Sequence, residues 1–359
     1  MVSKWKHREE SKLVSKAVVA EKSTEQLVEA RTFIKDLLDL RKAQKLEKTY
    51  IKGTFAATQY NEKDKVYVDY RFDGTATGRL SCAAYHAKEP MGVSFHTLPR
   101  ETTNNIRSIF VAPEGNTFVT VDYSTMELRV LAHLSRDKNM IKAFHSGEDL
   151  HSYTGSLLFN KDITEVSKSE RQLAKTVSFL IVYGGGAFNL SETMGISIRK
   201  AERVVTSYKE VYPEVFGFMD YIHNFIRSNG YTYTIFGRRR NLQDITSSDK
   251  SVQHRSLRQG FNFIVQSTSS DILLFSLLGI SERFKDRDME SRVVSTVHDS
   301  IELVCPHDEL SDALKIVREE MVDCHKIKQT FDIDFTIPFE IEVLVGKSFG
   351  EGIVETFNG

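Results

Sequence analysis

The residues best suited to chemistry in this chain recur every fourth position along one short stretch. If residues 171–186 form a helix, one face carries two cations followed by two aromatic rings, Arg171, Lys175, Phe179 and Tyr183. Such a face suits a nucleotide, whose triphosphate would meet the cations and whose flat base would meet a ring. The alternative is a solvated cationic face with both rings in the core. Three glycines predict that the helix ends at Gly184, because glycine adopts the left-handed conformation most easily.

Two aspartates favour the chemical interpretation of this helix, because each follows an apolar strand-like segment on either side of it. Asp122 follows residues 117–121, and Asp299 lies between two apolar runs that predict a hairpin with a polar tip. For Asp122 alone, a role as a helix cap is more common than a catalytic role.

The composition fits a globular protein with two or three subdomains. The chain has 359 residues, of which 40% are hydrophobic and 27% charged. No uninterrupted apolar run approaches the length of a membrane span and the N-terminus does not resemble a signal peptide, so we expect no membrane partner. Three scattered cysteines predict neither a disulfide framework nor a zinc site and suit a cytoplasmic location, the host cytoplasm if the chain is viral. With a net charge of −1, nucleic-acid binding would depend on local basic patches.

Three motifs together resemble family A DNA polymerases, the bacterial DNA polymerase I-like enzymes. The pattern R-xxx-K-xxx-F-xxx-Y-G at 171–184 resembles their fingers-helix motif. The string DYSTMELRVLAHLS at 122–135 is similar to their motif A across its length, and VHD at 297–299 resembles motif C. The resemblance extends from about Ser23 to the C-terminus. It implies an α+β fold of right-hand architecture, with an antiparallel palm sheet, helical fingers and a partial helical thumb.

The resemblance also implies a domain organisation. It divides the chain into partial thumb helices at 1–60, a first palm segment at 61–135, fingers at 136–245 and a second palm segment at 246–359. The thumb is shorter than usual in the family and no exonuclease-like domain precedes it. We therefore expect a separate chain that supplies these parts, a fragment, or an enzyme that works minimally.

Local patterns predict the elements that position these motifs. They indicate a loose helix or frayed start at 1–22, a helix from Ser23 to about Lys48, a strand at 66–72, helices on both sides of Pro213, a long helix at 251–279, a helix at 307–326 and a closing strand at 337–345.

The resemblance assigns the catalytic roles. Asp122 and Asp299 would bind two Mg²⁺ ions, helped by the carbonyl of Tyr123, and magnesium prefers such oxygen ligands. Arg171 and Lys175 would grip the triphosphate and offset the charge that builds on it.

The resemblance places four further side chains at the nucleotide. Glu127 matches the steric gate, which blocks the space beside the sugar 2′ carbon, and Phe179 would lie against the base and sugar. Tyr183 would sit at the template junction, and His151 would touch the phosphates. Taken alone, a histidine such as His151 is more often a capped or solvated surface residue.

Eight residues are expected to bind the primer–template. They are Arg79, Arg238, Arg239, Arg240, Arg258, Asn262, Gln266 and His298. Three of them step by four along one helix face, where polar groups can check minor-groove acceptors that all correct pairs share. The structural alternative is that these three cap neighbouring loops. For the arginine run, the alternatives are a solvated loop and phosphate contact.

Three segments depart from the family pattern. Leu180 stands where the family has glycine, and Ser300 stands where it has glutamate. Glu302 lies on the same strand face as Ser300 and could partly replace the missing charge. The segment SFHTLP at 94–99 matches its family counterpart only at apolar and proline positions.

The implied function is template-directed DNA synthesis. Deoxynucleoside 5′-triphosphates would be added to a primer 3′-hydroxyl by two-magnesium nucleotidyl transfer, in replication or repair. The alternative is a subunit of a split polymerase that needs a partner chain.

Three other classes fit less well. Single-subunit RNA polymerases usually carry a small residue at Glu127 and methionine at Phe179. An idle nucleic-acid-binding subunit would not need Asp122, Asp299 or the cations of the helix. A nuclease would need a carboxylate cluster, and no such cluster stands out in the sequence.

Overall fold

The computed structural model describes residues 24–60, 65–83, 93–99 and 105–358. The expected loose helix at 1–22 lies outside the described residues. The chain divides into two compact units, one of residues 1–69 and 84–94, the other of residues 70–83 and 95–359. Each unit is described by itself.

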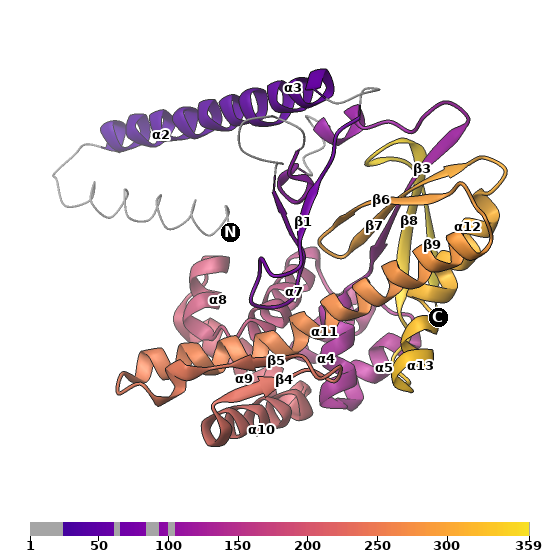
Figure 1. The fold of residues 1–359 in the computed structure, drawn as a ribbon. Coiled ribbons are helices and arrows are strands. Elements are labelled where there is room, and N and C mark those ends of the chain that lie inside the picture. Colours follow the sequence, from indigo (N-terminus) through magenta and orange to yellow (C-terminus); the bar gives the residue numbers. More distant parts are fainter. Residues whose placement is uncertain (1–23, 61–64, 84–92, 100–104, 359) are drawn as a thin grey trace. The chain divides into compact units, whose positions relative to one another are not determined.

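The first unit contains helices that continue past the predicted end. α2 (Thr24–Lys45) leads into the π-helical segment η1 (Leu46–Ile51) and then into α3 (Lys52–Tyr60) (Figure 1). The expectation that the helix ends near Lys48 is wrong. Neither glycine nor proline interrupts this stretch before Gly53, and both residues that flank η1 keep right-handed helical angles. The wider π turn therefore continues the helix and buries Tyr50.

The second unit is organised around a five-stranded antiparallel sheet in the order β6-β7-β3-β8-β9 (Figure 1). Its strands are β3 (Asn116–Tyr123), β6 (Arg292–Val297), β7 (Ser300–Pro306), β8 (Glu340–Ser348) and β9 (Glu351–Asn358). Alternation along the central strand buries Val119, Val121 and Tyr123 in the hydrophobic core. The predicted α+β class with an antiparallel sheet is confirmed.

Two expectations about the C-terminal part are wrong. The strand at 337–345 does not close the sheet, because β9 follows it after a tight turn at Gly350. The helix expected at 307–326 is two helices, α12 (Leu310–Met321) and α13 (His325–Phe331). Cys324 separates them in the left-handed conformation, which helical residues do not adopt.

Helices of the second unit surround the motif residues. They are α4 (Met126–Ser135), α5 (Lys138–Ser146), α6 (Leu150–Phe159), α7 (Lys168–Val182), α8 (Ala187–Met194), α9 (Ile198–Val211), α10 (Pro213–Asn229) and α11 (Lys250–Asp286). The predicted break at Pro213 is confirmed, since proline occupies the first turn of α10.

The chain also forms short elements, which belong to the second unit except for their first residue, Asp69. They are the paired strands β1 (Asp69–Arg71) and β2 (Ser81–Ala83), the hairpin of β4 (Tyr231–Tyr233) and β5 (Arg239–Asn241), and the 3-10 turns η3 (Phe95–Thr97), η4 (Ile106–Ile109), η5 (Ile163–Glu165) and η6 (Gln243–Thr246). The strand expected at 66–72 is therefore shorter than predicted.

The long helix α11 is the one described helix that is long and apolar enough to cross a membrane by length and composition. The sequence shows no uninterrupted apolar run of this length, because polar residues interrupt the apolar runs of α11. However, 72% of its most apolar window is buried within the protein. This burial is typical of a core helix, and Phe261, Ile264 and Ile272 join the hydrophobic core.

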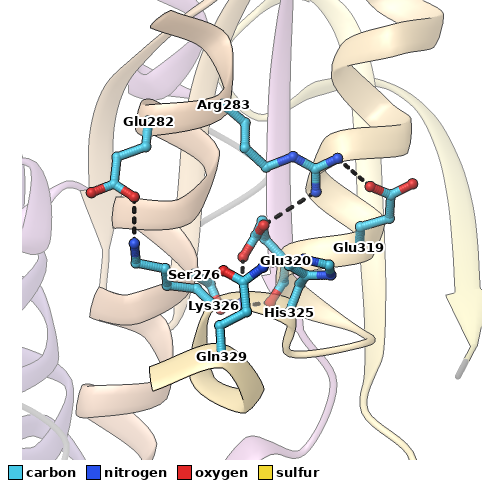
Figure 2. A network of polar contacts seen from close by, with 8 residues as sticks. All are labelled: Ser276, Glu282, Arg283, Glu319, Glu320, His325, Lys326 and Gln329. Carbon is cyan, nitrogen blue, oxygen red and sulfur yellow. Dashed lines mark hydrogen bonds and ion pairs between the residues drawn. The ribbon is translucent and has the colours of Figure 1, made fainter. Parts of the chain in front are cut away.

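A polar network fixes the C-terminal half of α11 against α12 and α13 (Figure 2). Arg283 donates to Glu319 and, at 3.1 Å, to the buried carboxylate of Glu320. The backbone N–H of Lys326 also donates to Glu320, at 3.0 Å, while its ammonium pairs with Glu282 at 2.5 Å. The buried charge of Glu320 is thus both paired and hydrogen-bonded, as burial of a carboxylate requires.

Acidification is expected to destabilise the protein through His133, at the end of α4. Burial lowers the pKa of His133 to about 4, with a smaller contribution from Arg136. Its Nδ1 accepts a hydrogen bond from the Thr336 backbone N–H at 3.1 Å, which requires an unprotonated nitrogen. The unfolded imidazole has a pKa near ~6.5, so it binds a proton first as the pH falls.

The variant His133→Asn tests this linkage, because its side-chain oxygen can accept the same hydrogen bond without titrating. Between pH 6.5 and 4, the free energy of unfolding of the wild type should fall by about 2 kcal/mol relative to the variant. Urea unfolding at four pH values measures the difference. If the difference in free energy of unfolding between the wild type and the variant does not change with pH, His133 is not the source of the acid sensitivity.

Candidate active site

The five-stranded sheet brings the two predicted metal-binding aspartates together. Asp122, at the end of β3, lies opposite Ser300 in the β3–β7 register. The next backbone N–H, that of Tyr123, donates to the carbonyl of Asp299 at 3.3 Å. Two strands that are far apart in sequence therefore present their carboxylates at one edge of the sheet.

The turn between β6 and β7 has only two residues, His298 and Asp299. His298 has φ +63°, the left-handed conformation that short hairpin turns need and that a side chain other than glycine adopts at a cost. The predicted hairpin with a polar tip is confirmed. Its tight turn fixes where Asp299 lies.

The side chain of Tyr123 is held by hydrogen bonds to α11 and α12. Its hydroxyl donates to the carbonyl of Met321 at 2.9 Å and lies 3.0 Å from Ser276 Oγ. Ser276 in turn bonds the carbonyl of Glu320, which belongs to the network in Figure 2. Burial raises the pKa of the Tyr123 hydroxyl well above its ordinary value. The ring thus holds the end of β3 in place through α11 and α12.

The oxygen donors at this edge suit magnesium. Asp122 and Asp299 supply carboxylates, and Tyr123 supplies a backbone carbonyl. No group of three or more His, Cys, Asp or Glu side chains placed to hold a metal occurs among the described residues. A site with two carboxylates still fits Mg²⁺, which commonly completes its shell with water and substrate phosphates.

Glu127 is held by two other predicted site residues. Its side chain is only 8% exposed, and Arg79 Nη2 lies 2.5 Å from Oε1. The hydroxyl of Tyr183 donates to Oε2 at 2.8 Å. Arg79, Tyr123, Glu127 and Asp299 line one small recess of about 10 Å³. Both oxygens of the predicted steric gate are therefore oriented, beside the aspartates.

The predicted cation-and-ring helix is α7. It begins at a capping box, in which the hydroxyl of Ser167 accepts from the N–H of Glu170 and the carboxylate of Glu170 accepts from the N–H of Ser167. It ends before Gly184, at φ +67°, as the glycines predicted. A Cβ at Gly184 would lie 2.6 Å from Arg258 Cγ, so Arg258 of α11 crosses the end of α7 closely.

His151 lies beside this helix. It is buried, and its ring centroid is 6.0 Å from that of Phe179. Burial lowers the pKa of His151 to about 4, opposed by Asp149 and reinforced by Lys175 and Arg171. His151 is therefore neutral near pH 7. It can donate one hydrogen bond, but it supplies no positive charge.

The chain matches the family model described as DNA polymerase family A over residues 1–351. The chain belongs to this family. The DNA polymerase I of Chloroflexus aurantiacus is 31% identical over 91% of the chain and 33% of its own length. The thermostable DNA polymerase I of Thermus filiformis is 32% identical over 94% of the chain and 38% of its own length. The chain thus spans about a third of these curated relatives.

A solved structure of the same family agrees with the fold. The POL domain of Pol1 from M. smegmatis, in complex with DNA primer-template and dNTP, superposes with a TM-score of 0.79. It is 29% identical, and the match covers 89% of this chain and 53% of that chain.

Within the run Arg238–Arg240, the first arginine is paired inside the protein. Arg238 pairs with the buried carboxylate of Asp271, with Nη2 2.6 Å from Oδ1. Its guanidinium also packs against Gly78, where a Cβ would lie 2.8 Å from Cζ. In this structure Arg238 therefore fastens the loop before Arg79 to α11.

Five other predicted DNA-binding residues lie in this region and range from exposed to half-buried. Arg239 stacks over the ring of Tyr231 at 3.8 Å, and Arg240 lies 5.7 Å from the ring of Phe263. On α11, Arg258 is exposed, whereas Asn262 and Gln266 are half-buried. Their roles in binding DNA stay predictions.

The two departures from the family motifs each have a structural partner. Leu180 packs on Gly185, where a Cβ would lie 2.2 Å from Leu180 Cδ2, so glycine makes room for the larger side chain. Ser300 Oγ lies 2.5 Å from Glu302 Oε1, and Glu302 is fully buried on the same sheet face. The sequence expectation of a shared face is confirmed, while replacement of the missing charge stays a prediction.

Two residues near the site were not identified from the sequence. His96 stacks on His298 with ring centroids 5.2 Å apart, and its Nε2 lies 3.1 Å from the carbonyl of Thr296. The departure of its segment from the family pattern was the available signal. Asp149 pairs with Arg171, and no pattern in the sequence marks it.

Proposed function

We propose that this chain carries the polymerase activity of a DNA-directed DNA polymerase, which adds deoxynucleotides to a primer 3′-hydroxyl. The proposal rests chiefly on one observation, the adjacency of Asp122 and Asp299 at the sheet edge next to the recess that contains Glu127. The binding of primer-template and deoxynucleoside triphosphate by the M. smegmatis POL domain supports the same substrates here.

Each group contributes a definite part of the reaction. Asp122, Asp299 and the Tyr123 carbonyl would hold two magnesium ions, which supply Lewis-acid activation of the hydroxyl and shield phosphate charge. Arg171 and Lys175 bind the triphosphate and stabilise the charge that moves to the leaving pyrophosphate. Phe179 and Tyr183 orient the base, and Glu127 restricts the sugar. The protein thus positions the reactants and stabilises charge rather than forming a covalent intermediate.

Primer extension by the purified chain tests the proposal. A primed DNA template is incubated with magnesium and either deoxynucleotides or ribonucleotides. Extension with deoxynucleotides alone is the expected result. Extension that prefers ribonucleotides, or none at all even after addition of a candidate partner chain and substitution Ser300→Glu, would overturn it. Extension only with a partner would favour the split-polymerase alternative.

A further inference from the structure

Arg171, the first cation of α7, is held by an acidic side chain from the preceding helix. Its Nε lies 2.8 Å from Asp149 Oδ2, and its Nη2 lies 2.7 Å from Oδ1. This two-pronged arrangement fixes the plane of the guanidinium, unlike a single contact with a flexible ammonium. Nη1 of Arg171 does not take part in the ion pair, so its N–H groups point away from the Asp149 carboxylate.

Asp149 is itself fixed, because it caps α6. Its Oδ2 accepts from the backbone N–H of Ser152 at 2.8 Å and from the hydroxyl of Ser152 at 2.7 Å. Together with Arg171, these donors hold the pKa of Asp149 at about 2 against the opposing effect of its partial burial. The carboxylate stays ionised at neutral pH and cannot turn without losing its cap.

The pair lies where the triphosphate is expected to bind. Two residues after Asp149 comes His151, which contacts Phe179, and one turn after Arg171 comes Lys175. Within the described part of the chain, Nδ1 of the buried His151 has no hydrogen-bond partner. The capped end of α6 thus places Asp149 against the Arg171 cation and the His151 ring beside Phe179 of α7.

The Asp149–Arg171 ion pair contributes little to the free energy of unfolding. Its main effect is therefore on the position of the Arg171 guanidinium. The side chains of Arg171 and Asp149 are 43% and 41% exposed, and ion pairs as exposed as this stabilise proteins only weakly. A bidentate contact nevertheless restricts a long side chain that would otherwise sample many rotamers.

We propose that Asp149 is a positioning residue for triphosphate binding, which holds the Arg171 guanidinium so that Nη1 faces the phosphates of the incoming nucleotide. This inference rests on the proposed function, since the phosphates belong to the polymerase substrate. Asp149 does not touch the substrate. It acts through Arg171 alone, and this dependence makes the inference testable.

The variant Asp149→Asn separates positioning from capping. Asparagine caps helices as well as aspartate does, so α6 is preserved, but the ionic two-pronged contact is lost. We expect the KM for deoxynucleotide to rise roughly fivefold to tenfold, as for coupled groups in direct contact, with a smaller change in kcat. In the Arg171→Ala background, Asp149→Asn should change KM no further.

Asp162→Asn is the matched control. Asp162 caps the turn at 163–165 in the same way, accepting from the N–H of Thr164 at 2.9 Å and from its hydroxyl at 2.6 Å, and it forms no ion pair with an arginine among the described residues. This variant should keep the wild-type KM. Circular dichroism and thermal unfolding of all variants check that helix content is retained.

Equilibrium dialysis with radiolabelled dGTP keeps the inference separate from the proposed function, because it needs no catalysis. Weaker dGTP binding by Asp149→Asn that disappears in the Arg171→Ala background supports positioning, even if extension fails. Unchanged or tighter binding, or an effect that persists without Arg171, would overturn it. Absence of extension by the wild type and Asp162→Asn would instead contradict the proposed function.

Discussion

Substitution of either Asp122 or Asp299 by alanine should abolish primer extension while leaving DNA binding largely intact. Each carboxylate would supply oxygen ligands for magnesium, and its loss would leave only one carboxylate of the pair. We expect the extension rate to fall by at least about 10³-fold, as for groups that stabilise charge in a transition state. Primer extension under single-turnover conditions measures the rate, and fluorescence anisotropy with labelled primer–template measures binding.

The loss should reflect chemistry rather than folding. Asp122 and Asp299 are partly exposed, so we expect their removal to leave the free energy of unfolding nearly unchanged. Asp308→Ala changes an exposed carboxylate in the turn after β7 and is the control, with wild-type extension expected. Retained extension in Asp122→Ala or Asp299→Ala would contradict the metal assignment.

Periodicity along the sequence was sufficient to predict the main positioning elements. Alternating apolar residues identify β3, and the spacing of four identifies the chemical face of α7. Glycine and proline mark the boundaries at Gly184 and Pro213, because their backbone preferences act locally. The two apolar runs around Asp299 predict the hairpin for the same reason. Local physical preferences thus account for most of the site framework.

Contacts between distant residues could not be predicted in this way. Asp149 and Arg171 are 22 residues apart, and Arg238 and Asp271 are 33 apart. Neither pair belongs to a helical or strand period, so each forms only when the tertiary fold brings its two segments together. The missed strand β9 has a different cause. The resemblance places the last strand of the family at 337–345, so no further strand was expected after it, although Gly350 lies in the turn before β9.

The family comparison and the geometry answer different questions. Similarity over nearly the whole chain establishes the family, yet it does not say which partner each side chain has. The structure adds these partners, and they change what a substitution means. Arg238, expected to contact phosphate, also anchors the Gly78 loop, so Arg238→Ala would disturb more than one interaction.

Glu127→Ala should weaken discrimination against ribonucleotides. The buried carboxylate occupies its place rigidly, since Arg79 and the Tyr183 hydroxyl hold one oxygen each. Removal of the four heavy atoms beyond Cβ, including both oxygens, would open space beside the sugar 2′ carbon. We expect the preference for deoxynucleotides, as a ratio of kcat/KM values, to fall roughly 100-fold. Single-nucleotide insertion of dGTP and GTP opposite the same template base measures this ratio.

The same substitution should also slow deoxynucleotide insertion, because Arg79 and Tyr183 lose their shared partner and become less ordered. Glu127→Gln separates the two effects. Its side chain has nearly the same volume and its oxygen can still accept from Tyr183, but it lacks the charge that pairs with Arg79. It should therefore keep the sugar preference within several-fold while inserting deoxynucleotides more slowly. If alanine preserves ribonucleotide exclusion, bulk at position 127 does not set sugar choice; if glutamine loses it, the charge of Glu127 matters more than its volume.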